Sequence, residues 1–368
     1  MMAVTSTEIL VSSSARLHMG FFDLHGGLGR KFGSIGLSLA TPNIELTAAS
    51  FQKLPSEKLP VTGAASVSVS AIAKATAIAQ QLITKLHLNG GVSLNIKQHI
   101  PEHAGLGSGT QLALAIGTAI SQLYSLNLST AKIAELTGRG GRSGIGIAAF
   151  NHGGLLIDGG RVTRPNLANP NSENSNIPPL LARYEFPEHW RILLILDSSQ
   201  PGIHGEEERT AFNELPVFSE NLAAHLCRHV LMQAMPALVE HDLTAFGNSI
   251  QELQAHVGDY FAPAQGGRYA SKQVGAVLQH LAHMGVACFG QSSWGPTGFA
   301  VFENAVEAEK HLQQLKMSFT DSSLTWIICS ARNHGVEISS SEISRAEISG
   351  AKISHIEHNP TRKSLFNT

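Results

Sequence analysis

A short glycine-rich segment, Pro101-Glu-His-Ala-Gly-Leu-Gly-Ser-Gly-Thr-Gln111, most limits what this chain can fold into. The apolar residues Val92, Leu94 and Ile96 alternate with polar ones just before it, which predicts a strand. The small apolar residues of 109–124 predict a helix directly after it. In a strand, glycine turn and helix, free backbone N–H groups and the positive end of the helix dipole face one point. The segment therefore predicts a phosphate site, with a merely flexible turn as the alternative.

Six residues of this segment are the candidates for holding a diphosphate. Glycine permits positive φ and a close approach of the backbone, and serine and threonine add hydroxyl donors. The six candidates are Gly105, Leu106, Gly107, Ser108, Gly109 and Thr110. The segment is neither a P-loop nor a dinucleotide fingerprint, because no Lys-Ser/Thr pair and no acidic residue at the ribose-binding distance follow the glycines.

Length and composition exclude several classes of function. At 368 residues the chain is long enough for two domains. Its formal charge of −2 lacks the basic field of nucleic-acid-binding proteins, so we expect no nucleic-acid partner. Three widely spaced cysteines without C-x-x-C spacing indicate free thiols in a reducing compartment, by default the cytoplasm. Residues 1–14 lack a signal-peptide pattern, and the chain has no apolar run of about 18 residues, so we expect no membrane association.

Hydrophobic periodicity divides the rest of the chain into strands and helices. Residues 7–50 combine short apolar runs with glycine turns, which is typical of sheet, and 159–188 reads as a crossover loop. Helices are expected at 70–88, 109–124, 221–256 and 270–285 and after Ser129, and strands at 92–96, 153–158, 191–197, 287–290, 298–302 and 324–329. Isoleucines spaced by five, from Ile338 to Ile353, match neither period. We therefore predict domains at 1–185 and 186–336 and a low-order tail at 337–368.

Three motifs, in order along the chain, resemble those of the GHMP superfamily of small-molecule kinases. They are Ser14-Ala-Arg-Leu-His-Met-Gly20, the glycine-rich segment at 101–111, and Gln291-Ser-Ser-Trp-Gly-Pro-Thr-Gly-Phe-Ala-Val301. The resemblance implies a two-domain α+β fold. Its N-terminal half would be similar to domain 2 of ribosomal protein S5, and its C-terminal half would be a ferredoxin-like α/β domain.

Two positions depart from the kinase pattern. Kinases of the mevalonate type carry Ser-Gly-Ile-Asp, whose aspartate orients or deprotonates the attacking hydroxyl, whereas this chain reads Ser143-Gly-Ile-Gly146. Gly109 stands where those kinases usually have a second serine beside the metal and the phosphates. Without a base for an alcohol, phosphorylation of a hydroxyl loses a main catalytic element.

One branch of the superfamily accommodates both departures. Segments 16–23, 103–111 and 136–150 look like those of the β-ribofuranosylaminobenzene 5′-phosphate synthases, and the similarity spans roughly residues 10–335. The resemblance implies a transferase that condenses phosphoribosyl pyrophosphate with 4-aminobenzoate, with loss of CO2 and pyrophosphate, in methanopterin biosynthesis. It also implies Mg²⁺ and a homodimer. An ATP-dependent kinase and a non-catalytic sensor of a phosphate ligand are the alternatives.

Charged residues near the motifs supply the remaining site predictions. Arginine forks suit bidentate recognition of the 5′-phosphate or the benzoate carboxylate, although exposed surface arginines are the alternative. The catalytic candidates are Arg16, His18, Arg139 and Arg142, and the other substrate-binding candidates are His103, Gln111, Ser143 and His204. For Mg²⁺ we predict Asp23 first and Glu208 second, although the acidic run at 205–209 also fits a solvated helix start.

The 18 histidines do not by their spacing predict a zinc site. Pro101 lies between His99 and His103, which rules out a shared helical face. His225 and His229 share a face, but the zinc-protease glutamate does not follow His225. Zinc is therefore not expected.

Overall fold

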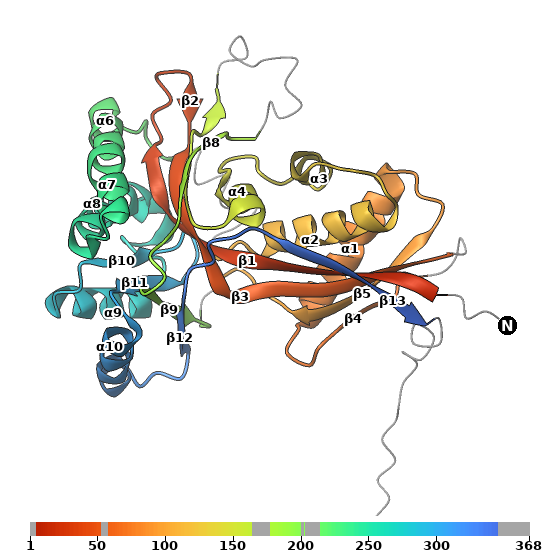
Figure 1. Ribbon diagram of the computed structural model, residues 1–368. Coiled ribbons are helices and arrows are strands. Elements are labelled where there is room, and N and C mark those ends of the chain that lie inside the picture. The colour runs from red at the N-terminus through yellow and green to blue at the C-terminus, as the bar shows by residue number, and fades with distance from the viewer. Residues whose placement is uncertain (1–4, 53–57, 164–176, 200–201, 203–213, 345–368) are drawn as a thin grey trace, which may run out of the picture.

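The computed structural model describes residues 5–52, 58–163, 177–199, 202 and 214–344. These form two large sheets covered by helices, and a small sheet of two short strands (Figure 1). The helices are α1 (Val69–Lys85), α2 (Ser108–Leu123), α3 (Thr130–Leu136), α4 (Ile145–His152), α6 (Glu220–His229), the π-helix η2 (Val230–Ala234), α7 (Met235–Val239), α8 (Leu243–Gln265), α9 (Lys272–His283) and α10 (Ala305–Ser318). The strands are β1 (Thr5–Asp23), β2 (Arg30–Lys31), β3 (Gly33–Phe51), β4 (Val61–Gly63), β5 (Gly91–Gln98), β6 (Leu155–Asp158), β7 (Arg161–Val162), β8 (Leu180–Tyr184), β9 (Arg191–Asp197), β10 (Cys288–Gln291), β11 (Gly298–Phe302), β12 (Leu324–Cys329) and β13 (Glu337–Ser344).

The N-terminal sheet is built around two long antiparallel strands, β1 and β3. One part of β3, residues 45–51, pairs with β5, and its earlier part, residues 34–37, pairs with β6. The first motif lies in the later part of β1, which extends toward the C-terminal half (Figure 1). Helices α1 and α2 cover one face of this sheet, and serine side chains cap the starts of α1 and α3 as the sequence predicts for Ser129.

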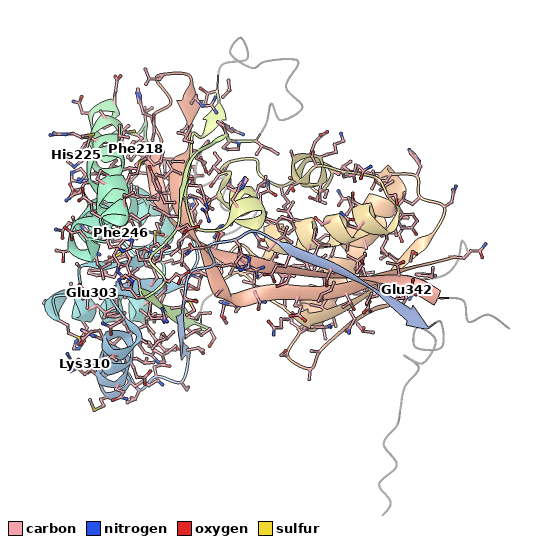
Figure 2. All side chains as sticks on the ribbon, in the orientation of Figure 1. Phe218, His225, Phe246, Glu303, Lys310 and Glu342 are labelled. Carbon is pink, nitrogen blue, oxygen red and sulfur yellow. The ribbon has the colours of Figure 1, made fainter. Side chains whose placement is uncertain are left out.

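The C-terminal sheet has the strand order β10-β11-β9-β12, and all its pairs are antiparallel. Along the chain its elements follow as strand, helices, strand, strand, helix, strand, which is the ferredoxin-like arrangement that the sequence implied. The predicted helical stretch at 221–256 is divided into α6, η2, α7 and α8. Figure 2 shows Phe246 among these helices and Lys310 on the exposed side of α10.

One cluster of buried residues extends through both halves and forms a continuous core. Phe186, Trp190 and Phe246 are fully buried, with ring centroids 5.2 to 6.1 Å apart. Phe186 and Trp190 lie just before β9, and Phe246 belongs to α8. No helix among the described residues is long and apolar enough to cross a membrane.

Two of the sequence predictions at domain edges are wrong. The predicted crossover loop at 159–188 contains β8, which pairs with β6 and extends the first sheet. The predicted low-order tail begins with β13, which pairs with β1 from Thr5 to Ser12, while residues 345–368 lie outside the described part. The chain thus returns to its first sheet after the second domain, because the edge of β1 offers unpaired backbone groups. Side-chain periodicity could not predict this pairing, since main-chain hydrogen bonds make it.

Candidate active site

Three motifs that lie far apart in the sequence meet where β1 passes the start of α2. The Arg16 N–H donates to the Leu106 carbonyl oxygen over 3.1 Å, and the Arg16 guanidinium donates to the Gly105 carbonyl oxygen. The Ser292 hydroxyl donates to the same Gly105 oxygen over 2.8 Å and accepts the His18 N–H at 3.0 Å. The three motifs therefore form one hydrogen-bonded junction.

Glycines allow the second and third motifs to touch through their backbones. Gly105 has φ of +76°, and a Cβ there would overlap the Ser292 carbonyl oxygen and lie 2.9 Å from Gly295 Cα. A Cβ on Gly202 would lie 2.8 Å from both Gly295 Cα and the His103 carbonyl oxygen. These are main-chain neighbours that cannot rotate away. The glycines predicted to grip a ligand therefore also hold the two motifs together.

The start of α2 has the geometry of an anion site. Gly107 caps the helix in the left-handed conformation, with φ of +82°, and contributes no side chain. The carbonyl oxygen of Gly107 already accepts the N–H groups of Thr110 and Gln111, each at 3.1 Å. The Arg139 guanidinium lies beside Gly109, whose Cβ would be 3.3 Å from Arg139 Nη1. Amide dipoles and a cation thus converge on the predicted diphosphate position.

Gly146 packs against the same helix start. A Cβ there would lie 3.2 Å from Thr110 Cγ2, closer than most real contacts. The side chain of Gln111 is fully buried, and its amide donates to the Gly146 carbonyl oxygen over 2.7 Å. This bond holds α4 against α2. The side-chain oxygen of Gln111 has no partner among the described residues, so substrate binding by Gln111 stays a prediction.

The hydroxyl of Ser143 is hydrogen-bonded to the buried carboxylate of Asp158. This hydroxyl donates to Asp158 Oδ2 over 3.0 Å, and Ser34 and the Gly144 N–H donate to the same oxygen over 2.7 and 2.9 Å. Burial raises the pKa of Asp158, and its four hydrogen bonds oppose that rise. Ser143 was predicted to bind substrate, and these bonds use its hydroxyl to fix the loop that carries Arg139 and Arg142.

An aromatic pocket adjoins the junction, and sequence reasoning missed it. It lies between β1, α8 and residues 291–294 and is open to solvent on one side. Its buried wall residues include Phe21, Phe261 and Trp294, and the last two rings lie 4.3 Å apart. Three distant segments supply these rings, so no local spacing could have revealed the pocket.

His18 lines this pocket as a neutral imidazole. The residue is 3% exposed, and its ring lies 4.5 Å from the ring of Phe21. Burial, and then the positive charges of Arg16 and Arg142, lower the pKa of His18 from 6.5 to about 3. The backbone of His18 is fixed on both sides, because its N–H donates to Ser292 and its carbonyl oxygen accepts the Ser293 N–H.

The free energy of unfolding should therefore decrease as the pH is lowered, and His18 should account for part of this decrease. Below pH 6.5 the unfolded chain binds a proton at this residue and the folded chain does not, down to about pH 3. The cost is about 1.4 kcal/mol per pH unit. Urea unfolding of the wild type and of His18→Asn at pH 7.5 and 4.5 measures it. We expect the wild type to lose roughly 2–3 kcal/mol more than the variant; equal losses would contradict a buried neutral His18.

Four predicted residues remain, of which the structure describes two, His103 and Asp23. His103 is exposed, and its Nε2 lies 3.2 Å from Lys74 Nζ, so it faces the start of α1. Asp23 accepts the N–H groups of His25 and Gly26, and it lies roughly 20 Å along β1 from Arg16 at 3.3 Å per residue. Asp23 as a metal ligand stays a prediction. Glu208 and His204 lie outside the described residues.

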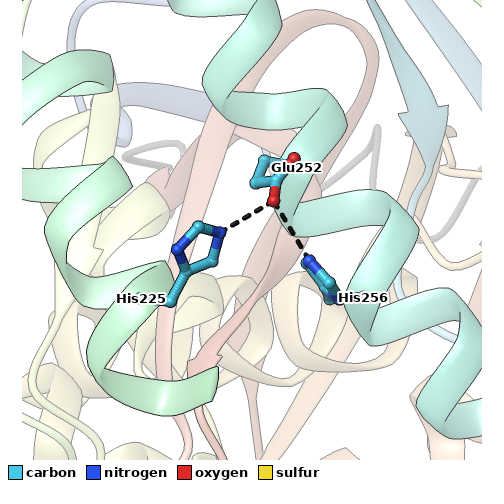
Figure 3. A group of neighbouring side chains, drawn as sticks. All are labelled: His225, Glu252 and His256. Atoms are coloured by element: carbon cyan, nitrogen blue, oxygen red, sulfur yellow. Dashed lines mark hydrogen bonds and ion pairs between the residues drawn. The ribbon is translucent and has the colours of Figure 1, made fainter. Parts of the chain in front are cut away.

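A second group of titratable residues lies on the opposite face of α8 from the pocket (Figure 3). Glu252 Oε1 lies 2.7 Å from His225 Nε2 and 3.1 Å from His256 Nε2. Hydrogen bonds from His225 are the main cause that lowers the pKa of Glu252. Two imidazoles and one carboxylate could hold a divalent ion, which the sequence did not predict because α6 supplies His225 and α8 the others. All three side chains are about two-fifths exposed, as expected of a surface ion network too.

Comparisons with known proteins agree with this geometry. Residues 69–154 match the GHMP kinases N terminal domain, and residues 234–319 match the GHMP kinases C terminal domain. A homoserine kinase from Cytophaga hutchinsonii has the same fold, with a TM-score of 0.62 and 16% identity over 90% of this chain and 97% of that one. The fold and the three-motif junction thus define a GHMP-type protein.

The sequence relatives narrow the class. A β-ribofuranosylphenol 5′-phosphate synthase from Archaeoglobus fulgidus is 36% identical over 329 residues, which cover 88% of this chain and 97% of that protein. The synthase of the same name from Methanocaldococcus jannaschii is 34% identical over 82% of this chain and 92% of that protein. The chain belongs to the β-ribofuranosylphenol 5′-phosphate synthase family, which confirms the resemblance.

Proposed function

We propose that this chain joins the ribosyl carbon of phosphoribosyl pyrophosphate to the ring carbon of a para-substituted benzoate, in methanopterin biosynthesis. The observation that carries the proposal is Gly146, which packs on Thr110 beside the phosphate site and offers no carboxylate to an alcohol. Ring attack needs no hydroxyl to be deprotonated, because the para substituent already activates the nucleophilic carbon. The names of the relatives, which specify a ribosyl 5′-phosphate on an aromatic ring, support the same reaction.

The reaction balances without a covalent intermediate on the protein. The bond between the ribosyl carbon and pyrophosphate breaks, and pyrophosphate leaves with that electron pair. The ring carbon that carries the carboxylate bonds to the ribosyl carbon. The ring then loses CO2, and the electrons of that bond restore aromaticity. The protein's contribution is to position both substrates and to stabilise the departing diphosphate.

The para substituent of the acceptor is the open chemical detail. The resemblance of the motifs implied an amine, from 4-aminobenzoate, whereas the relatives' names specify a phenol hydroxyl. Either group donates electrons to the carbon opposite it on the ring. We therefore propose a para-substituted benzoate as the acceptor class, and the assay below uses both 4-hydroxybenzoate and 4-aminobenzoate.

We also propose that Mg²⁺ enters with the diphosphate. Magnesium usually keeps several waters and binds substrate phosphates, so it does not require a full set of protein ligands. At the start of α2 the hydroxyls of Ser108 and Thr110 are the protein oxygens that fit it. When bound, the ion would neutralise charge on the leaving pyrophosphate.

The assay that tests the function mixes the protein, Mg²⁺, phosphoribosyl pyrophosphate and one of the two carboxyl-labelled benzoates. Labelled CO2 and pyrophosphate in equal amounts support the transfer. The competing function, suggested by the kinase fold, is phosphorylation of a small alcohol by ATP. ADP release with a panel of alcohols, and no CO2, would replace the proposal with that kinase.

The assembly and the compartment belong to the same proposal. Leu231, Met232 and Val239 are each more than half exposed along η2 and α7, which supports a homodimer interface there. Size-exclusion chromatography with light scattering distinguishes a dimer from a monomer. The described cysteines are free, which supports the cytoplasm as the compartment.

A further inference from the structure

We propose that the aromatic pocket beside the junction binds the ring of the acceptor, with the carboxylate against His18 and the para substituent toward Gln265 and Arg268. This inference rests on the proposed transfer for the identity of the acceptor. It is carried by a buried polar group that the fold itself leaves unsatisfied.

The unsatisfied group is the imidazole of His18. Neither of its ring nitrogens has a hydrogen-bond partner among the described residues, although the side chain is buried. Leaving a buried donor unpaired costs about 1–3 kcal/mol, so such groups in native proteins call for an explanation. Because the imidazole lines the pocket, a bound molecule can supply the missing partner.

The surrounding charges indicate that this partner is an anion. Arg16 and Arg142 lie close enough to disfavour a third positive charge on His18. A neutral imidazole still offers one N–H donor. The two guanidinium groups attract a carboxylate to this end of the pocket, and the imidazole N–H pairs with it. A neutral donor also suits a carboxylate that must leave as CO2, because a strong ion pair with His18 would stabilise the carboxylate in the ground state.

The position of His18 fixes the direction of the ring. The Ser292 hydroxyl accepts the backbone N–H of His18 and donates to the Gly105 carbonyl oxygen, so this end of the pocket adjoins the diphosphate loop. The ring carbon that bonds to the ribosyl carbon is the one that carries the carboxylate, and it must therefore lie at this end. The para substituent then points away from the loop, toward the last turn of α8.

The body of the pocket fits an aromatic ring. Phe21, Phe261 and Trp294 present buried ring surfaces, and offset or edge-to-face packing of aromatic rings is favourable. Gln265 and Arg268 are polar lining residues at and just after the end of α8, and we place the para substituent beside them. Arg268 also forms a two-point ion pair with Asp259, at 2.7 and 2.8 Å, which fixes its position.

Calorimetric titration in the absence of phosphoribosyl pyrophosphate tests the orientation, with 4-hydroxybenzoate and its neutral analogue 4-hydroxybenzamide as ligands. We expect the wild type to prefer the carboxylate by at least about tenfold. His18→Phe keeps a ring but removes the donor, and it should reduce the preference to less than about threefold while amide affinity is retained. The matched change His283→Phe, at an exposed position on α9, should leave the preference unchanged.

Two further measurements keep the outcomes separate. If His18→Phe fails to fold, His18→Asn, which retains an N–H donor, should keep part of the preference. A wild type that binds acid and amide equally, or a His18→Phe variant that discriminates like the wild type, overturns the inference. The CO2 assay reports on the transfer separately. Release of CO2 with no carboxylate preference leaves the function standing, and the expected binding without CO2 release removes the function while the pocket assignment stands.

Discussion

The change Gly105→Ala is expected to abolish measurable turnover and to lower the free energy of unfolding by roughly 2–5 kcal/mol. The left-handed backbone at φ of +76° costs a non-glycine residue about 1–2 kcal/mol. The added methyl group would also overlap the Ser292 carbonyl oxygen, and a main-chain atom cannot rotate away. The Gly105 carbonyl oxygen bonds both Arg16 and Ser292, so a shift of Gly105 would also move the loop that faces the diphosphate.

A control substitution at Gly266 separates the cost of a left-handed backbone from the cost of a steric overlap. Gly266 has φ of +82°, and a Cβ there would meet nothing within 4 Å. Gly266→Ala should therefore cost only about 1 kcal/mol and leave turnover close to that of the wild type. Urea unfolding and the CO2 assay measure both variants. If Gly105→Ala were no more harmful than Gly266→Ala, the backbone junction would not be essential to the site.

The change Arg139→Ala is expected to raise the KM for phosphoribosyl pyrophosphate by roughly 10- to 150-fold, with a much smaller change in the KM for the benzoate. The guanidinium beside Gly109 faces the helix start where the diphosphate would bind. A hydrogen bond to a charged oxygen contributes about 1.5–3 kcal/mol, which corresponds to this range.

The substitution pattern at this position distinguishes charge from geometry. Arg139→Lys should recover part of the affinity, because lysine keeps the charge but not the planar fork. Arg228→Ala, at an exposed position on α6, should behave like the wild type. Steady-state kinetics with each substrate varied separately measures all three. A rise in the benzoate KM instead would assign Arg139 to the acceptor carboxylate and not to the diphosphate.

Local patterns predicted the elements closely. The apolar run at 191–197 and the stretch at 324–329 are β9 and β12 within the predicted limits, and α2 begins one residue before its prediction. Period and capping depend on neighbours within a few residues, so the sequence carries them directly. The glycine loop and the first and third motifs were also predicted, because backbone conformation at a phosphate site restricts residue type.

Tertiary contacts decided the roles of individual side chains. Ser143 and Gln111 were predicted to touch substrate, but the Ser143 hydroxyl bonds Asp158 and the Gln111 amide nitrogen bonds Gly146. Asp23 has the right chemistry for a metal ligand, and its carboxylate accepts the N–H groups of His25 and Gly26. A residue type reports what a side chain can bind, while its partners in space decide whether it is available.

The sequence by itself determined the GHMP-type fold and the synthase family, and it predicted the diphosphate loop and, through Gly146, a reaction that does not deprotonate an alcohol. Only the tertiary structure decided that β13 pairs with β1 in the first sheet and that Phe21, Phe261 and Trp294 line one pocket together with His18. The physical reason is the range of the interactions. Helix periods, caps and glycine turns are local, whereas edge pairing and pocket walls unite segments whose separation in the chain has no characteristic length.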